Sequence, residues 1–382
     1  MRSVLGFIIF MLVFISLYGG LHYYFLSKTR AAYLLSFKSS IPLIVILIIL
    51  MFTPLIVAML DKWELEGSAR AIAYIGYIWM GILFLFCSIS VLIDIYRLII
   101  YFIGSNKSYY EILLTAKLRL FIPLFASAAI CIYGIFEADN IRLEKVIVKT
   151  SKLPAGINQL KIAQISDVHL GLIVREYKLN KILEQVKKAD PDIFVSTGDL
   201  VDADTTKLDK YIDALNEVKP RYGKYAVTGN HEFYFGLAKA LDFTQKSGFT
   251  ILRAQSADVA NIITVAGVDD HTAESSDEDK SLKEKELLSS LDQKKFILFL
   301  KHRPSIKKNA IGFFDLQLSG HTHKGQIFPF RLFTRIFFKY TGGNLYKIMN
   351  SYIYVSNGSG TWGPPIRFLA PPEVTLIELV RE

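Results

Sequence analysis

Five short clusters of metal-binding residue types follow one another in the C-terminal half of this 382-residue chain. They are Asp167-Val168-His169, Gly198-Asp199, Gly229-Asn230-His231-Glu232, His302-Arg303-Pro304 and Gly320-His321-Thr322-His323. Five of the seven histidines of the protein lie in these clusters. Each cluster alone has an ordinary explanation, either as a turn or as a structural histidine, but together they contain enough carboxylate, amide and imidazole groups to hold two divalent cations side by side. Paired cations of this kind hydrolyse phosphate esters.

Each cluster comes directly after an apolar run of strand length, which is where α/β sheets collect their ligand sites. The predicted strands are Leu143–Val148, Lys161–Ser166, Ile193–Thr197, Tyr225–Thr228, Ile262–Val268, Phe296–Leu300, Leu316–Ser319, Tyr352–Val355 and Thr375–Leu379. Stretches with helical periodicity lie between them, at Arg175–Lys188, Thr206–Val218, Leu237–Ser247 and Ser281–Leu291. This alternation predicts a layered α/β domain over residues 141–382.

The first third of the chain has a different character, with long apolar runs at Val4–Phe25, Ile41–Leu60, Ala71–Ile93 and Leu120–Phe136. A membrane-spanning helix needs about 20 apolar residues, and the first three runs contain no Lys, Arg, Asp or Glu. The fourth run is shorter, but Lys117 and Arg119 before it can extend the span. We therefore predict a transmembrane region with four spans over residues 1–140. A cleavable signal peptide is the alternative for the first run, and its length disfavours that interpretation.

The distribution of basic residues gives an orientation for these spans. The loops after the first and third spans contain Lys28, Arg30, Lys38, Arg97, Lys107, Lys117 and Arg119, whereas the amino terminus and the 61–70 loop contain Arg2, Lys62 and Arg70. Because cytoplasmic loops are enriched in Lys and Arg, this count favours an extracytoplasmic domain. The basic residues that follow the last span, Arg142, Lys145 and Lys149, weaken the asymmetry.

The soluble half resembles a calcineurin-like metallophosphoesterase, because Asp-x-His, Gly-Asp-x-x-Asp, Gly-Asn-His-Glu, His and Gly-His-x-His occur in the order of that superfamily. Gly325-Gln326 and the segment from Asn357-Gly358 to Pro371-Pro372-Glu373 are similar to its membrane-associated branch. That branch contains bacterial phosphoesterases and transmembrane proteins with a metallophosphoesterase domain. The resemblance implies a four-layer α/β/β/α sandwich for residues 141–382, attached to a bacterial inner or plasma membrane.

The resemblance also implies roles for the clustered residues. Asp167, His169 and His323 would hold one metal, with Asp199 bridging to a second metal held by Asn230, His302 and His321. The catalytic residues would be Asp199 and His231, and His231 would either protonate the leaving group or orient the phosphate as a hydrogen-bond donor. The cofactors would be two divalent ions, and mixed nitrogen and oxygen ligands suit Mn, Fe or Zn without choosing among them.

Two departures from the wider superfamily bear on the substrate. Protein phosphatases of the superfamily have Arg-Gly after Gly-Asp-x-Val-Asp, whereas this chain has Ala203-Asp204, which disfavours protein substrates. Lys324 stands where close relatives have Gly, and its cation either pairs with a substrate phosphate or is simply tolerated.

A cationic and aromatic segment follows the last cluster. In Phe330–Tyr340 the cations Arg331, Arg335 and Lys339 are four residues apart, and the apolar residues Phe333, Ile336, Phe337 and Tyr340 are spaced by three, one and three. This pattern predicts an amphipathic helix, which can lie on an anionic bilayer surface. In the commoner alternative, its aromatic face packs on the catalytic domain.

From these features we expect a membrane-anchored phosphoesterase that cleaves a phosphoester or pyrophosphate bond in a lipid-linked substrate. Lys324, Arg331, Phe333, Arg335 and Lys339 are the candidate substrate- and membrane-binding residues. The resembled branch includes UDP-2,3-diacylglucosamine pyrophosphatases of lipid A synthesis, and a phospholipid or isoprenoid phosphate of the cell envelope stays open as the substrate. The expected partners are the lipid bilayer and the lipid-linked phosphate, with no nucleic acid despite the net charge of +9. A nuclease or broad-specificity phosphodiesterase and a non-catalytic metal-binding scaffold are the alternatives.

Overall fold

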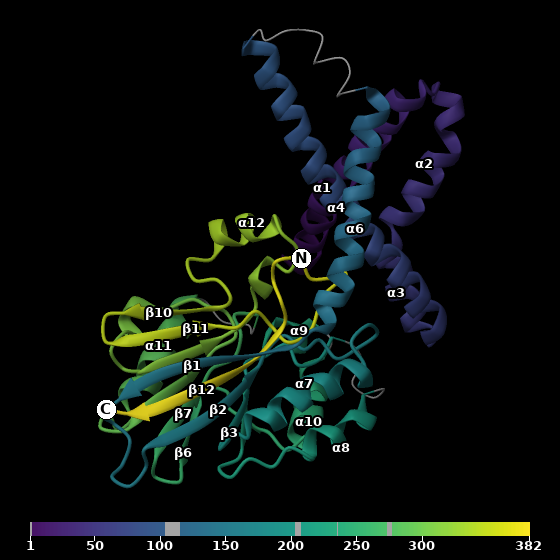
Figure 1. The fold of residues 1–382 in the computed structure, drawn as a ribbon. Coiled ribbons are helices and arrows are strands. Elements are labelled where there is room, and N and C mark those ends of the chain that lie inside the picture. Colours follow the sequence, from purple (N-terminus) through teal and green to yellow (C-terminus); the bar gives the residue numbers. More distant parts are fainter. Residues whose placement is uncertain (1, 104–114, 203–207, 235, 273–276) are drawn as a thin grey trace. The chain divides into compact units, whose positions relative to one another are not determined.

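The computed structural model describes residues 2–103, 115–202, 208–234, 236–272 and 277–382, with the side chains of residues 2–10, 103 and 277–282 left out. It divides into two compact units, which are considered separately (Figure 1). The first comprises Met1–Ile135 with Gly363–Ile366, and the second comprises Phe136–Trp362 with Arg367–Glu382. The division falls close to the predicted domain boundary after residue 140.

The first unit is helical. Its helices are α1 (Arg2–Tyr33), α2 (Phe37–Met51), α3 (Thr53–Lys62), α4 (Glu66–Ile103) and α6 (Ala116–Asp139), the last of which continues into the second unit. Among the described residues, Glu66–Phe102 and Ala116–Asp139 are long and apolar enough to cross a membrane. These two helices contain the predicted third and fourth spans.

The other two predicted spans are not confirmed. The run Ile41–Leu60 forms two helices, α2 and α3, that are bent by 52°, so the pair is either one broken span or a re-entrant loop. The break lies at Phe52, just before Pro54, which lacks the N–H that a continuous helix would need. The run Val4–Phe25 lies within α1, but its first side chains are outside the described part of the chain. Among the described residues there are thus two to three candidate spans, and the predicted four are not confirmed.

The second unit contains two mixed six-stranded sheets, which confirms the predicted α/β class. The first sheet has the order β1 (Arg142–Thr150), β12 (Glu373–Arg381), β2 (Gln159–Ile165), β3 (Ile193–Ser196), β4 (Lys224–Ala226) and β5 (Thr250–Ile251). The second has the order β10 (Asn344–Ile348), β11 (Ser351–Val355), β9 (Leu316–Ser319), β8 (Phe296–Leu300), β7 (Ile263–Gly267) and β6 (Gln255–Val259). Strands β2 to β5 are parallel to one another, as are β7, β8, β9 and β11.

Three apolar cores hold the layers together. Ile162 and Val195 of the first sheet pack with Leu298 and Leu318 of the second in the core between the sheets. The outer face of the first sheet packs against α7 (Glu176–Ala189) and α10 (Leu237–Lys246). On the outer face of the second sheet, Phe299 shares a core with Leu288 of α11 (Asp277–Ser289). The layers thus run helix, sheet, sheet, helix.

The structure also contains elements that the sequence pattern did not predict. Strand β5 has two residues, and β6 and β10 are largely exposed edge strands without an apolar run, so they show no strand signal. The predicted helix Thr206–Val218 is shorter: its described part forms η2 (Asp209–Tyr211) and α8 (Ile212–Asn216). Residues 203–207 lie outside the described chain.

Candidate metal centre

The strand ends bring all five clusters to one place between the two sheets. Asp167 follows β2, Asp199 follows β3, and α9 (Asn230–Tyr234) follows β4. From the second sheet, His302 follows β8 and His321 follows β9. Because the parallel strands of each sheet end at the same edge, their loops converge.

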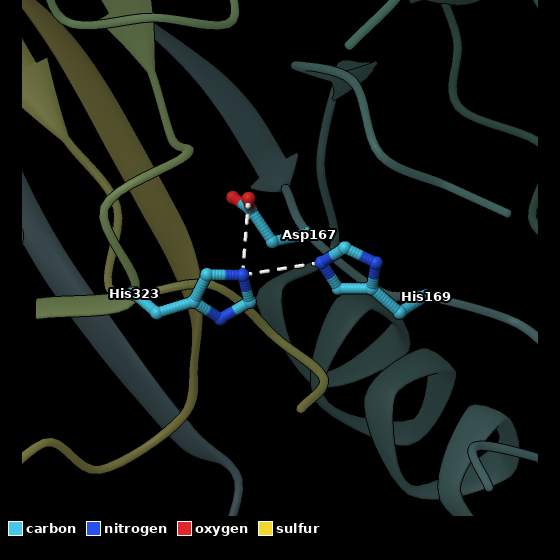
Figure 2. A group of neighbouring side chains, drawn as sticks. All are labelled: Asp167, His169 and His323. Carbon is cyan, nitrogen blue, oxygen red and sulfur yellow. Dashed lines mark hydrogen bonds and ion pairs between the residues drawn. The ribbon is translucent and has the colours of Figure 1, made fainter. Parts of the chain in front are cut away.

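The first group of donors comprises Asp167, His169 and His323, all of them buried (Figure 2). The Nε2 atoms of His169 and His323 are 3.1 Å apart, and His323 Nε2 is 3.4 Å from Asp167 Oδ1. One ligand atom from each residue lies within 4.8 Å of the other two. Figure 2 shows the side chains of Asp167 and His169, from the loop after β2, and that of His323, from the loop after β9, pointing toward one another.

The second group comprises Asp199, His302 and His321. His302 Nε2 is 3.1 Å from His321 Nδ1, 3.2 Å from Asp199 Oδ2 and 3.2 Å from Asn230 Oδ1. Asp199 Oδ2 also lies 3.9 Å from Nε2 of His169, which belongs to the first group. Asp199 therefore stands between the two groups, where a bridging carboxylate would be needed.

The backbone at these positions is strained. Asp167, His169, Asp199, His321 and His323 all have left-handed φ values between 46° and 67°. This conformation costs an L-residue about 1–2 kcal/mol, and it persists here because neighbouring loops hold it. The N–H groups of Asp167 and His169 donate to the carbonyls of Gly198 and Asp199, at 3.0 Å in each case. Strain concentrated in one cluster is typical of a functional site.

The protonation states suit cation binding. Burial lowers the pKa values of His169 and His323 well below the ordinary value, and that of His321 to about 3, so these rings are neutral and keep a lone pair. Burial would also lower the pKa of His302, but the charge of Asp199 and its hydrogen bond raise it to about 10. The proton on His302 thus offsets buried carboxylate charge. A divalent cation would supply that positive charge instead, so the donor set fits metal ions that accept mixed nitrogen and oxygen ligands.

His231 lies beside this cluster with an acidic partner. Its Nδ1 is 2.6 Å from Asp202 Oδ1, and its Nε2 faces the cluster at 4.0 Å from Asp199 Oδ2. Burial alone would lower the pKa of His231, but the hydrogen bond to Asp202 and the charge of Asp199 raise it. The exposed rings of Tyr234 and Trp362 contact the imidazole edge to face, with centroids 5.5 and 5.7 Å away.

The structure shows supporting residues to which the sequence analysis gave no role. Asp202, the second Asp of the Gly-Asp-x-x-Asp pattern, orients His231. The carboxylate of Glu232, in the third cluster, accepts hydrogen bonds from the N–H groups of Asp199, Leu200 and Gly229 at 3.1, 2.7 and 2.7 Å. Glu232 thereby ties the loop of Asp199 to the loop that carries Asn230.

Arg367 is the supporting residue with the least sequence signal. Its guanidinium is fully buried and donates to the carbonyls of Asn357 at 2.7 Å and His323 at 3.2 Å. Its Nη2 also lies 3.3 Å from Nδ1 of His323. Arg367 therefore fixes the loop and the ring of a predicted metal ligand from behind.

The candidate substrate- and membrane-binding residues lie on or next to α12 (Phe330–Phe337). The helix is shorter than the predicted Phe330–Tyr340, because Phe338 adopts an extended conformation with φ −122° and ψ 118°. The Phe338 ring packs against His321, with centroids 5.3 Å apart. Lys339 consequently lies beyond the helix end, while Lys324 directly follows the ligand candidate His323.

The apolar face of α12 is exposed and does not pack on the rest of the second unit. Thr334 is the buried residue of the helix, whereas Phe333, Ile336 and Phe337 are 51%, 75% and 79% exposed. The alternative that the aromatic face packs on the domain is therefore not what the structure shows. Arg331 is half-buried and Arg335 is exposed.

Gly320 offers a test of how Asp167 is held. A Cβ atom at this position would lie 1.9 Å from Ser166 Oγ and 2.2 Å from Asp167 Oδ2. We expect Gly320→Ala to displace Asp167 and to weaken metal binding by about 10- to 100-fold, the usual effect of disturbing a ligand's support. Metal content after dialysis measures this. Gly67→Ala is the control, because nothing lies within 4 Å of a Cβ there; full metal retention by Gly320→Ala would contradict the arrangement.

Comparison with known proteins agrees with this geometry. The family model described as calcineurin-like phosphoesterase matches residues 160–325. An uncharacterized metallophosphoesterase of Aquifex aeolicus is 40% identical over 258 residues, covering 67% of this chain and 98% of that protein. One from Campylobacter jejuni is 33% identical over 297 residues, covering 75% of this chain and 76% of that protein.

A vertebrate relative is similar over more than the catalytic domain alone. The transmembrane protein with metallophosphoesterase domain of Danio rerio is 30% identical over 277 residues, which cover 68% of this chain and 62% of that protein. Family model, relatives and clustered donors agree on one conclusion: this chain belongs to the calcineurin-like metallophosphoesterases.

Proposed function

We propose that this protein is a membrane-anchored, dinuclear metal-dependent phosphoesterase that hydrolyses a phosphoester or pyrophosphate bond in a lipid-linked substrate. The observation that carries the lipid part of the proposal is the position of α12. Its apolar face is exposed, and the residue that ends it, Phe338, contacts the ligand candidate His321. An exposed apolar surface thus borders the donor cluster, and this supports a substrate held in the bilayer.

The residues of the cluster have different roles in the proposed hydrolysis. Asp167, His169 and His323 would hold one cation, Asn230, His302 and His321 the other, and Asp199 would bridge them. When bound, such a pair of cations polarises the phosphate and activates a water molecule. His231 is placed to give the proton on Nε2 to the leaving oxygen, because Asp202 keeps Nδ1 protonated from the other side.

The surface of α12 supports a bilayer-bound substrate. A helix on a soluble domain turns its apolar side inward, whereas Phe333, Ile336 and Phe337 point outward here. Contiguous exposed apolar surface marks a site of membrane or protein interaction. The nearby cations Arg335 and Lys339 are exposed as well, which suits an anionic lipid surface.

The class of lipid depends on the side of the membrane. A UDP-2,3-diacylglucosamine-like substrate requires a cytoplasmic domain, where UDP-sugars are made. The Lys and Arg count favours the opposite side and, with it, a phospholipid or isoprenoid phosphate of the cell envelope. A reporter fused to the C-terminus distinguishes the two, since it is active on one side only.

The lipid part can be tested on the full-length protein in mixed micelles with Mn²⁺. We expect Ile336→Ser/Phe337→Ser to lower the rate on a lipid-linked phosphodiester relative to the rate on soluble bis-p-nitrophenyl phosphate. The expected change in this ratio is about tenfold or more, because each buried apolar side chain contributes about 1.5–3 kcal/mol.

The matched control for this experiment removes exposed apolar side chains elsewhere on the same unit. Ile147 and Tyr177 are 53% and 65% exposed and lie on β1 and α7. Ile147→Ser/Tyr177→Ser is expected to leave the ratio of the two rates at the wild-type value. An equal fall in both double variants, or no fall in either, would remove α12 from the proposal.

A further inference from the structure

We propose that Arg303 binds a phosphate oxygen of the substrate and stabilises the charge that develops on it during hydrolysis. This inference rests on the proposed function and adds to it a substrate-binding residue that is not a metal donor. Arg303 and Arg367 both act electrostatically on histidines of the donor cluster. Their hydrogen bonds and their exposure differ, and the difference determines which guanidinium a substrate can reach.

Arg367 is not available to a substrate. Its side chain is fully buried. Nε and Nη1 donate to the carbonyls of Gly360 and Asn357 at 3.1 and 2.7 Å, and Nη2 donates to that of Gly358 at 3.3 Å. All three nitrogens of the guanidinium are therefore used to hold the connection between β11 and β12.

Arg303 uses only part of its hydrogen-bonding capacity. Its Nε donates to Asp270 Oδ2 at 2.8 Å and its Nη2 to Asp270 Oδ1 at 3.2 Å. A guanidinium has five N–H groups, and the other three form no hydrogen bond with the described residues. The side chain is 27% exposed. Arg303 is thus a guanidinium that is fixed on one side and keeps donors, Nη1 among them, for a ligand.

Asp270 holds Arg303 in a fixed orientation. This carboxylate is buried, and its Oδ1 also accepts from the N–H and the hydroxyl of Thr272 at 2.9 and 2.7 Å. The N–H of Asp270 donates to Thr228 Oγ1 at 3.2 Å. Two hydrogen bonds to an anchored carboxylate restrict the guanidinium plane. Less conformational freedom is then lost when Arg303 binds a further anion.

Arg303 lies at the accessible side of the second donor group. Asp199 and His302 of this group are buried, whereas His321 is half-buried. A substrate therefore reaches the group at His321, and this is the ring on which Arg303 acts electrostatically. Arg303 also directly follows His302 in the chain. A phosphate that binds at the second donor group thus approaches on the side of the guanidinium.

The chemistry of the guanidinium suits a phosphate. Arginine presents its N–H groups in a planar fork that matches the oxygens of phosphate. Donors aimed at oxygens on which negative charge develops lower the barrier to hydrolysis. Arg303 would thereby bind the phosphate of the substrate, and bind it more strongly in the transition state.

The test uses the full-length protein in neutral detergent with Mn²⁺. We expect Arg303→Gln to raise the dissociation constant of inorganic phosphate, measured by calorimetry, about 10- to 100-fold, the range for a hydrogen bond to a charged group. For bis-p-nitrophenyl phosphate, kcat/KM should fall about 100-fold. The metal content should equal that of the wild type, because Arg303 is not a metal donor.

Arg253 provides a matched control. Its Nε and Nη2 contact the carboxylate of Asp269, the neighbour of Asp270, at 3.0 and 2.9 Å, and its side chain is 39% exposed. Arg253→Gln thus breaks the same kind of ion pair outside the metal-donor groups found among the described residues, and it should leave phosphate binding and kcat/KM unchanged. Asp270→Asn keeps Arg303 but weakens its support, so its effect should be smaller than that of Arg303→Gln.

A second substitution keeps the proposal falsifiable if Arg303→Gln is too unstable to measure. Arg303→Lys retains the charge but lacks the planar fork, so it should also weaken phosphate binding, though by less. Wild-type phosphate binding in both Arg303 variants would overturn the proposal. A loss of metal that accounts for the weaker binding would also overturn it, because Arg303 would then only support the loop of His302. Since phosphate binding is measured without turnover, this result is distinct from success or failure of the proposed hydrolysis.

Discussion

Asp199→Asn is expected to lower the Mn²⁺-dependent hydrolysis of bis-p-nitrophenyl phosphate by at least about 100- to 1000-fold, the range lost when one electrostatic stabiliser is removed from an active site. Asp199 belongs to the second donor group with His302 and His321, and it also forms a potential metal-binding group with His169 and His231. Its charge is what would offset the repulsion between two neighbouring cations. The amide keeps the shape of the side chain and removes that charge.

The protein offers a closely matched control for this substitution. Asp190 also has a left-handed backbone, with φ 45° against 51° for Asp199, and its side chain is 92% exposed. Asn tolerates that conformation, so Asp190→Asn makes the same chemical change at a residue that belongs to none of the metal-donor groups found among the described residues. It is expected to have wild-type activity.

Metal analysis separates the possible causes of a loss of activity in Asp199→Asn. Asp199→Asn protein that binds fewer metal ions than wild type would support the bridging position. Retention of both the full metal content and the activity would defeat the assignment of Asp199 and, with it, the proposal of a dinuclear hydrolase.

The donor residues could be predicted from the sequence because strand ends determine where they lie. An apolar run followed by Asp167 or His302 indicates both a strand and the edge at which it ends, and parallel strands bring such edges together. The roles of individual ligands came from the resemblance to the superfamily. The structure adds distances consistent with those roles, such as the 3.2 Å between His302 Nε2 and Asp199 Oδ2.

Supporting contacts were harder to predict, because their partners have no distinctive residue type. Arg367 donates to backbone carbonyls of His323, Asn357 and Ala370, and every residue has a carbonyl. No spacing in the sequence indicates that the loop after β9 and the connection between β11 and β12 will present theirs to one guanidinium. Edge strands escaped prediction for a related reason: β6 and β10 bury few side chains, so they have no apolar period.

Hydropathy also does not indicate where an apolar run breaks into two helices, or which face of a helix is buried against the rest of the protein. The run Ile41–Leu60 has the composition of one span, yet the chain bends by 52° at Phe52. The sequence of α12 is compatible with an apolar face turned either way. Burial of Thr334, with Phe337 left exposed, decides between them, and that depends on how the residues before and after the helix are fixed.

Asp202→Asn is expected to slow the hydrolysis of a simple alkyl phosphodiester by about 100-fold and that of bis-p-nitrophenyl phosphate by less than about tenfold. Proton transfer by a positioned side chain contributes about 100- to 10,000-fold. An alkoxide leaving group needs that proton, whereas p-nitrophenolate is stable without it. Asp202 affects the reaction through His231, whose Nδ1 it contacts at 2.6 Å. His231→Gln should show the same selectivity with a larger effect.

The ratio of the two rates decides between the two roles open to His231. If His231 only orients the phosphate as a hydrogen-bond donor, Asp202→Asn and His231→Gln will slow both substrates equally, because both present the same phosphate. Equal losses accompanied by lower metal content would instead indicate that Asp202 supports the metal site, since its Oδ1 also lies 4.0 Å from Nδ1 of His169. A loss confined to the alkyl substrate requires a proton donor on the leaving-group side, and His231 is the residue in position to supply it.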